Sequence, residues 1–195
     1  MSEIKDYAVE HHVPIIRDGG LEFLLQTVSE GHYHDILELG TAIGYSAINM
    51  AKISKDIQID TIERNPEMFE QAQINVQKEN LADQIHLNFG EIKDFVPNKK
   101  YDFIFVDAAK GQYYNYLNQF IDYLLPEGIM FFDNMEFHGM VKNPELTKNR
   151  NTRQLVKKIK NFRDKVQDDP RFDIILYENI GDGILILSRR KDYEI

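Results

Sequence analysis

Short continuous runs of apolar residues alternate along the chain with longer segments of helical periodicity. The continuous runs predict buried strands at residues 36–39, 57–62, 85–88, 101–106 and 129–132. The periodic segments predict helices at residues 21–28, 66–80 and 113–124. Because strands alternate with helices, we expect right-handed crossovers and a parallel sheet.

The C-terminal part of the chain departs from this alternation. A helix with Leu155, Ile159, Phe162 and Val166 on one face is followed by apolar runs at 172–177 and 184–189, which a short glycine-containing turn joins. This spacing predicts an antiparallel hairpin. The expected fold is therefore an α/β, Rossmann-like domain over residues 1–195, with a mostly parallel seven-stranded sheet and a C-terminal antiparallel hairpin.

Glycine and proline mark the expected interruptions. A short N-terminal helix should end before Pro14, and Gly19-Gly20 should break the chain before the next helix. Pro126-Glu127-Gly128 predicts a turn into the fifth strand. Residues 135–150 predict a long loop, and loops of that length are usually functional or disordered.

The stretch Ile36–Ser46 predicts a strand, a glycine turn and the start of a helix. Gly40 permits a sharp turn and a close backbone approach to a ligand. Glu38 falls at the carboxyl end of the strand, where a carboxylate repels a diphosphate and favours a cationic ligand. This favours S-adenosylmethionine over NAD. Glu63, 23 positions after Gly40, is a candidate for the ribose hydroxyls, or else a solvated strand end.

Oxygen-bearing side chains follow the fourth and fifth predicted strands. Asp107 ends one strand and Asp133-Asn134 ends the next, so the three side chains should converge at one sheet edge. Two carboxylates and an amide suit Mg²⁺ or Ca²⁺, although Asp133-Asn134 could instead cap a turn. Lys110 lies three residues after Asp107. Beside a dication its ammonium form is disfavoured, so it is a candidate general base, with a surface lysine as the alternative.

Charge and composition narrow the class of protein. Cysteine is absent, which excludes disulfides and thiolate metal sites, and no window resembles a signal peptide or a membrane span, so we expect a cytoplasmic protein. The net charge is −9, yet residues 142–165 hold nine basic and two acidic residues, a net +7 against −16 elsewhere. This segment is a candidate contact for RNA phosphates, with coenzyme A phosphates or plain solvation as alternatives.

Together these motifs resemble the metal-dependent class I O-methyltransferases of the catechol and caffeoyl-CoA type. The resemblance covers nearly the whole chain and rests on Glu38–Ser46, Glu63, Asp107–Lys110 and Asp133-Asn134. Within that family, residues 11–15, 40–48, 61–65 and 107–113 are most similar to the bacterial members that methylate 5-hydroxyuridine in tRNA. The family often has Gly-Asp-Ala where this chain has Gly90-Glu91-Ile92, and its N-terminal segment is usually longer.

The resemblance implies a role for each matched residue. S-adenosylmethionine would be held by Glu38, Gly40 and Ser46 at its methionine end, by Glu63 at the ribose, by Glu91 near the adenine, and by Ile16 and Asp107. Mg²⁺ would be bound by Asp107, Asp133 and Asn134, and Lys110 would be the catalytic base. The resemblance also implies a homodimer with tRNA as substrate. The lack of a long apolar span, rather than the resemblance, predicts no membrane association.

Three functions stay open at this point. The favoured one is methylation of 5-hydroxyuridine in tRNA to 5-methoxyuridine, because of the full motif set and the basic segment. The two adjacent oxygens of 5-hydroxyuridine resemble those of a catechol, so the same site could methylate either class of acceptor. The second is the same chemistry on a small catechol-like or caffeoyl-CoA-like acceptor. The third, a non-catalytic nucleotide- or RNA-binding module, is disfavoured by the intact set of candidate site residues.

Overall fold

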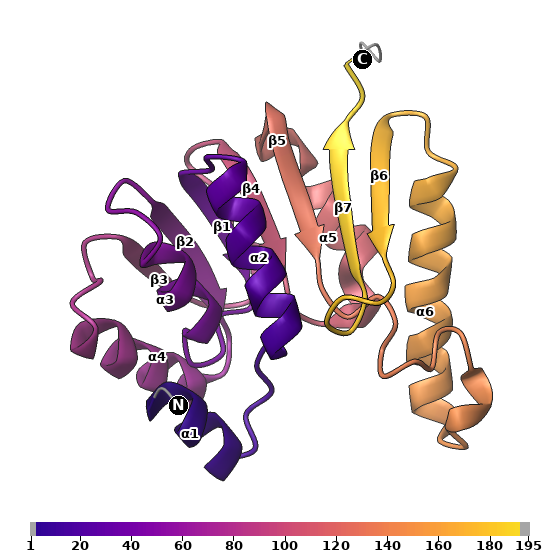
Figure 1. Cartoon of the computed structure of the whole chain (residues 1–195), viewed down its shortest axis with the longest axis horizontal. Coiled ribbons are helices and arrows are strands. Elements are labelled where there is room, and N and C mark those ends of the chain that lie inside the picture. The colour runs from indigo at the N-terminus through magenta and orange to yellow at the C-terminus, as the bar shows by residue number, and fades with distance from the viewer. Residues whose placement is uncertain (1–2, 192–195) are drawn as a thin grey trace.

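Seven strands form one sheet in the computed structural model, which describes residues 3–191 (Figure 1). They are β1 (Asp35–Leu39), β2 (Gln58–Glu63), β3 (Ile85–Phe89), β4 (Tyr101–Val106), β5 (Leu124–Phe132), β6 (Phe172–Tyr177) and β7 (Ile184–Arg189). Their order is β3-β2-β1-β4-β5-β7-β6. The first five are parallel, and β7 runs antiparallel to both β5 and β6. The predicted fold class and the terminal hairpin are therefore confirmed.

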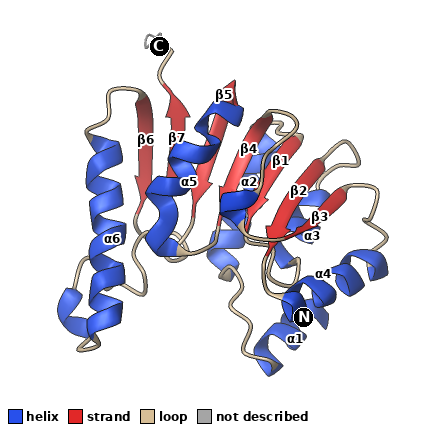
Figure 2. Ribbon diagram, turned by 180° about the vertical axis from the view of Figure 1, so that it is seen from behind, coloured by secondary structure: helices blue, strands red, loops and turns tan. Residues whose placement is uncertain are grey.

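Helices flank both faces of this sheet. They are α1 (Glu3–Glu10), α2 (Asp18–Glu30), α3 (Tyr45–Ala51), α4 (Pro66–Lys78), α5 (Tyr113–Phe120) and α6 (Arg150–Gln167). In Figure 1 α2 and α3 lie in front of the sheet, and the reverse view in Figure 2 shows α5 and α6 over the other face. The parallel strands all end at the lower edge in these views, so any residue that follows a strand is delivered to that edge.

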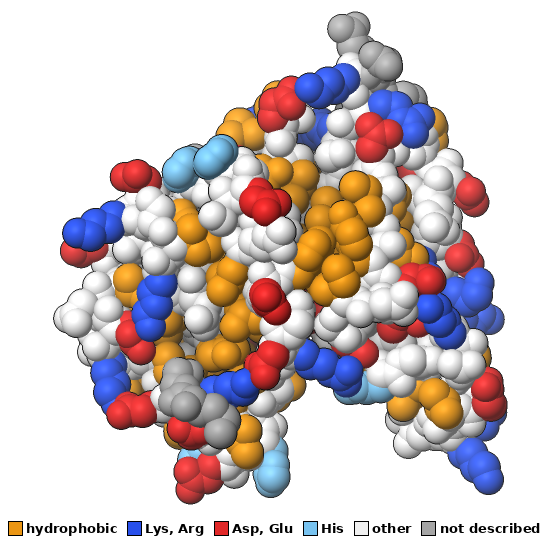
Figure 3. Space-filling view, in the orientation of Figure 1, with side chains coloured by type: hydrophobic (Ala, Val, Ile, Leu, Met, Phe, Trp, Pro, Cys, Tyr) orange, Lys and Arg blue, Asp and Glu red, His pale blue; other side chains and the backbone are white. Residues whose placement is uncertain are grey.

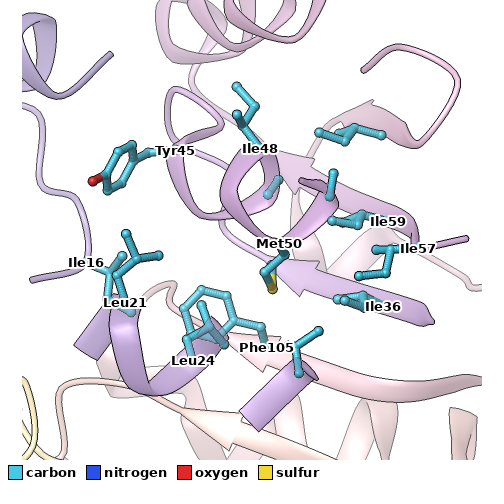
Figure 4. Close-up of a cluster of buried hydrophobic side chains, with 14 of the residues drawn as sticks. Ile16, Leu21, Leu24, Ile36, Tyr45, Ile48, Met50, Ile57, Ile59 and Phe105 are labelled. Carbon is cyan, nitrogen blue, oxygen red and sulfur yellow. The ribbon is translucent and has the colours of Figure 1, made fainter. Parts of the chain in front are cut away.

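Alternation of side chains along the strands divides the core into two layers. Ile36, Phe105 and Phe131 pack with α2 and α3, in the cluster that Figure 4 shows in part. Their neighbours in sequence, such as Leu37 and Val106, pack with α5 and α6 instead. Because both layers are apolar, the central strands read as continuous hydrophobic runs in the sequence.

Part of the front face has no covering helix. Figure 1 shows β7 and β6 open on the side of α2, and in Figure 3 hydrophobic side chains gather over this region. Ile175 on β6 is 54% exposed there. The homodimer expected from the family resemblance stays a prediction.

Within residues 3–191, none of the helices combines the length and the apolar character needed to cross a membrane.

The expected break at Gly19-Gly20 is wrong, because both glycines lie inside the first turn of α2. Because glycine has no side chain, the start of α2 can pack closely against the turn between β6 and β7. A Cβ built on Gly181 of that turn, where φ is +58°, would lie 3.0 Å from the Gly20 Cα. The turn therefore approaches the start of α2 more closely than a side chain would allow.

The expected helix end and turn before the fifth strand are also wrong. Helix α5 ends at Phe120, and a 3₁₀ turn over Ile121–Tyr123 leads directly into β5. Residues 126–128 lie within this strand, where the register shifts so that Tyr101 pairs with Leu124 but Phe103 pairs with Ile129. The proline is tolerated because the extra residues bulge out of the ladder.

Phe131 should contribute strongly to stability, because it is fully buried among Phe23, Phe103 and Phe105. We expect Phe131→Ala to lower the free energy of unfolding by about 3–5 kcal/mol through lost burial and a cavity. Urea denaturation followed by circular dichroism measures this loss. Ile74→Ala, at a position that is 51% exposed, is the control. A loss below about 1 kcal/mol for Phe131→Ala would show that this layer does not hold the sheet together.

Candidate active site

Three strand ends form one row at the lower edge of the sheet. The backbone N–H of Asp107 donates to the Leu39 carbonyl at 3.1 Å, and that of Asp133 donates to the Val106 carbonyl at 3.2 Å. The N–H of Gly40 donates to the Ile62 carbonyl at 3.2 Å. The ladder therefore continues one residue past the strands and fixes both aspartates side by side, as the sequence predicted for neighbouring strands.

Gly40 is required where the chain turns out of β1. Its φ is +102°, and a Cβ there would lie only 2.5 Å from the Asp107 carbonyl oxygen. A real Cβ would force the two strand ends apart. The close approach seen here is to the backbone of Asp107, directly after β4, and it brings Asp107 against the glycine turn. The close approach to a ligand that the sequence predicted at Gly40 stays a prediction.

Glu38 lies beneath this turn and is fully buried. Its carboxylate accepts hydrogen bonds from the Ser46 hydroxyl and from Thr61 Oγ1, the latter at 2.5 Å. Burial raises the pKa of Glu38 to about 8, while the two hydroxyl donors oppose the rise and the charges of Asp107 and Glu63 add to it. A neutral carboxyl at this depth would become a carboxylate as a cation approaches.

A cleft of about 590 Å³ opens along the same edge. Its walls include Ile16 from the segment between α1 and α2, Ser46 at the start of α3, Glu63 at the end of β2, and Glu91 after β3. Glu63 accepts the N–H groups of Ala42 at 2.9 Å and Asn65 at 2.7 Å, which fix its carboxylate on the cleft wall. All the candidate cofactor residues except Glu38 line this cleft.

Ile16 joins the cleft to the hydrophobic core. It is 5% exposed and packs with Leu21 and Tyr45 in the hydrophobic cluster between the sheet and helices α2 and α3, which Figure 4 shows in part. The N-terminal segment is therefore anchored by its apolar side chains while its backbone borders the cleft.

Asp107, Asp133, Asn134 and Lys110 lie together at one end of the cleft. Lys110 Nζ is 3.7 Å from Asp107 Oδ1, and the Asn134 N–H donates to Asp133 Oδ1 at 2.7 Å. Asp133 is 2% exposed, and its burial together with the Asp107 charge raises its pKa to about 7. Burial also raises the pKa of Asp107, against the pull of the Lys110 charge.

This oxygen-rich end has the chemistry of a site for a hard cation. The carboxylates of the half-buried Asp107 and the buried Asp133 repel each other, and a dication between them would relieve both the repulsion and the burial cost. Within residues 3–191 no three His, Cys, Asp or Glu side chains form a metal-binding group. The candidate set contains an amide in place of a third carboxylate, so an acceptor and water would have to complete the coordination.

Sequence reasoning missed two contributors to the site. Thr61 supports Glu38, and their pairing in the β1–β2 register is a signal that could have revealed it. Asp182, in the turn between β6 and β7, is 5% exposed and lies 3.6 Å from Arg17 and 3.9 Å from the His138 ring. Because β6 runs parallel to β5, this turn had to fall at the same sheet edge.

The strand order, the glycine turn and the cleft at the carboxyl ends of the strands define a Rossmann-like fold of the methyltransferase class. A family model described as O-methyltransferase matches residues 3–191. The chain therefore belongs to the O-methyltransferase family.

Individual relatives extend this result. The chain is 29% identical to a caffeoyl-CoA O-methyltransferase of Medicago sativa, over 98% of the chain and 82% of the relative. A Staphylococcus aureus structure, described as a candidate caffeoyl-CoA O-methyltransferase, is 33% identical with a TM-score of 0.92, covering 97% of this chain and 93% of that one. A Podospora anserina methyltransferase, solved with S-adenosylhomocysteine, is 25% identical with a TM-score of 0.80, covering 88% and 78%.

The buried Glu38 should make stability depend on pH. Its folded pKa of about 8 lies above its unfolded value near 4.5, so the folded state binds the proton more tightly. Its contribution is complete below pH 4.5 and is lost as the pH rises toward 8. Relative to wild type, Glu38→Gln should therefore gain roughly 3–5 kcal/mol between pH 5 and pH 8.5.

Urea denaturation of the ligand-free protein at several pH values measures this difference. Glu22→Gln, at an exposed position on α2, is the matched control and should follow the wild type. Parallel stability curves for wild type and Glu38→Gln would mean that Glu38 is already ionised in the folded protein.

Proposed function

We propose that the protein is an S-adenosylmethionine- and Mg²⁺-dependent O-methyltransferase that converts 5-hydroxyuridine in tRNA to 5-methoxyuridine. The cofactor assignment is supported by the cleft and by family members that bind S-adenosylhomocysteine. In this proposal Glu63 accepts the ribose hydroxyls and the buried Glu38 carboxyl supports the turn that faces the cationic end of the cofactor. The segment Pro14–Arg17, which borders the cleft, shields the cofactor from water.

The metal assignment is supported by the donor set. Asp107, Asp133 and Asn134 would hold Mg²⁺ through oxygen atoms, as expected for a hard cation. When bound, the cofactor supplies an electrophilic methyl group and Mg²⁺ polarises the acceptor hydroxyl. Lys110 takes the hydroxyl proton at Nζ, and its separation of 3.7 Å from Asp107 keeps it at the edge of the metal site.

The choice of tRNA as acceptor is supported by the contact between α6, which carries most of the basic segment, and the loop that carries Lys110. Helix α6 packs on residues Lys110–Gln112, and a Cβ on Gly111 would lie 3.7 Å from Lys158 Nζ. In Figure 1 α6 extends past the sheet edge at which the parallel strands end. A phosphate bound to the first half of α6 would therefore lie beside the candidate base.

Only part of the basic segment is available for such a contact. Arg163, Lys142 and Lys160 form ion pairs with acidic neighbours, and Lys165 lies over the Tyr114 ring. Across the described residues, no ion pair involves the five exposed cations before and within the first half of α6, namely Lys148, Arg150, Arg153, Lys157 and Lys158. The electrostatic attraction for phosphate is thus concentrated at the end of α6 nearest the cleft.

A small catechol-like or caffeoyl-CoA-like acceptor is the second candidate. It is favoured by the names of the curated relatives, which are caffeoyl-CoA O-methyltransferases at 28–30% identity. Coenzyme A also carries phosphates that the same cations would attract. The two candidates differ in extent of contact, because tRNA spans more of the basic surface than coenzyme A does.

The acceptor is tested with the double variant Lys157→Glu/Lys158→Glu. Each reversed charge removes a phosphate attraction, so we expect kcat/KM for tRNA containing 5-hydroxyuridine to fall at least about tenfold at physiological salt. The rate of methyl transfer to a simple catechol should stay within about twofold of the wild-type rate, because in this proposal the catechol oxygens bind only at the metal and do not reach α6. Radiolabelled methyl incorporation measures both reactions.

Lys100→Glu, at the opposite end of the sheet, is the matched control and should leave both rates unchanged. If wild-type protein methylates a catechol or caffeoyl-CoA rapidly but transfers no methyl group to the tRNA, the RNA assignment is wrong and the second candidate is adopted.

The base role is tested with two variants of one residue. Lys110→Met removes the amine, and Lys110→Arg keeps a cation near Asp107 but cannot lose its proton at neutral pH. Both should lower kcat by roughly 10²–10⁴ if Lys110 is the base. Single-turnover methyl transfer measures the effect, with Lys55→Met on the exposed surface as the control. Near-normal turnover of Lys110→Arg would leave Lys110 with an electrostatic role only.

A further inference from the structure

The turn between β6 and β7 holds the segment that carries the candidate metal ligand Asn134. The Met135 N–H donates to the Gly183 carbonyl at 2.9 Å, and the Glu136 N–H donates to the Asp182 carbonyl at 2.7 Å. A Cβ on Gly183, where φ is +83°, would lie 2.6 Å from the Glu136 nitrogen. The turn and the segment are therefore in direct backbone contact.

The Asp182 side chain reaches from this turn into the cleft. Its Oδ1 accepts the His138 N–H at 2.7 Å, and its Oδ2 lies 3.5 Å from the Asn134 Nδ2. The first contact anchors one carboxylate oxygen, and the second oxygen faces the amide. At 5% exposure, little water competes for these contacts.

A carboxylate accepts hydrogen bonds but cannot donate them, whereas an amide has one donating and one accepting side. Of the two orientations of the Asn134 amide, only the one with NH₂ toward Asp182 is attractive. Its Oδ1 is then on the opposite side of the planar group and is available as a metal ligand. In the reverse orientation two oxygens would face each other, and NH₂ would be offered to the cation.

The backbone around Asn134 needs such support. Asn134, Phe137 and His138 all have positive φ, at +60°, +43° and +59°. Side chains other than glycine adopt this region at a cost, which the surrounding contacts must offset. Asp182 contacts two of these three residues, through the Asn134 amide and the His138 N–H.

We propose that Asp182 is a positioning residue that orients the Asn134 amide so that its oxygen binds the metal. This inference rests on the proposed metal dependence and adds a residue outside the candidate ligand set. It assigns Asp182 no contact with the reacting atoms.

The test uses Mn²⁺ as the probe and isothermal titration calorimetry as the readout. Asp182→Asn has the same shape but offers both a donor and an acceptor, so it no longer selects one orientation of Asn134. We expect its Kd for Mn²⁺ to rise about 10–100-fold, as for other outer residues that orient metal ligands. Asp173→Asn, at an exposed position on the same hairpin, is the control and should bind Mn²⁺ as the wild type does.

A second background separates orientation from general damage to the fold. In Asn134→Asp both side-chain oxygens at this position can bind the metal, so there is no amide to orient. Adding Asp182→Asn to that variant should change the Mn²⁺ Kd less than about threefold. A structural defect would instead weaken binding equally in both backgrounds and would overturn the proposal.

The remaining outcomes are also decisive. If wild-type protein binds Mn²⁺ and Asp182→Asn binds it equally well, the role of Asp182 is wrong while the proposed function stands. If wild-type protein binds no Mn²⁺, the proposed metal dependence fails and the role of Asp182 fails with it.

Discussion

The candidate site depends on one close approach, between Gly40 and the carbonyl oxygen of Asp107. A side chain at position 40 would have to lie 2.5 Å from that oxygen, so only glycine lets the ends of β1 and β4 meet. This contact brings the turn that borders the cofactor cleft against the residue that begins the oxygen-rich end.

The same edge concentrates carboxyl groups that burial disfavours in their charged form. Glu38, Asp107 and Asp133 all have raised pKa values, because each lies largely out of water, and neighbouring acids add to the rise for Glu38 and Asp133. Such groups cost stability in the ligand-free protein. A cation bound near these groups would relieve that cost.

Much of this arrangement could be predicted from the sequence. The apolar runs located each strand, and β4, β6 and β7 have the predicted bounds. Asp107 and Asp133 were predictable as neighbours because each directly follows a buried strand, and parallel strands end at one edge. The roles of the candidate site residues stay predictions, since proximity alone does not show what each one binds.

Contacts between distant turns and loops could not be predicted. Gly19 and Gly20 looked like chain breakers because their packing partner, Gly181, lies far away in the sequence. Pro126 suggested a turn because a bulge within a strand leaves no periodic signal. Asp182 was missed because its proposed role depends on its contacts with a segment of positive-φ residues. Such a segment has no repeating pattern that could be recognised in the sequence.

The central claim, that this fold transfers a methyl group to 5-hydroxyuridine in tRNA, is tested most directly in cells. Nucleosides from tRNA of a strain that lacks the gene are compared by mass spectrometry with those of its parent and of a strain complemented with the gene. The account predicts that 5-methoxyuridine disappears, that 5-hydroxyuridine accumulates, and that complementation restores the parent pattern. Unchanged 5-methoxyuridine in the deletion strain would contradict it.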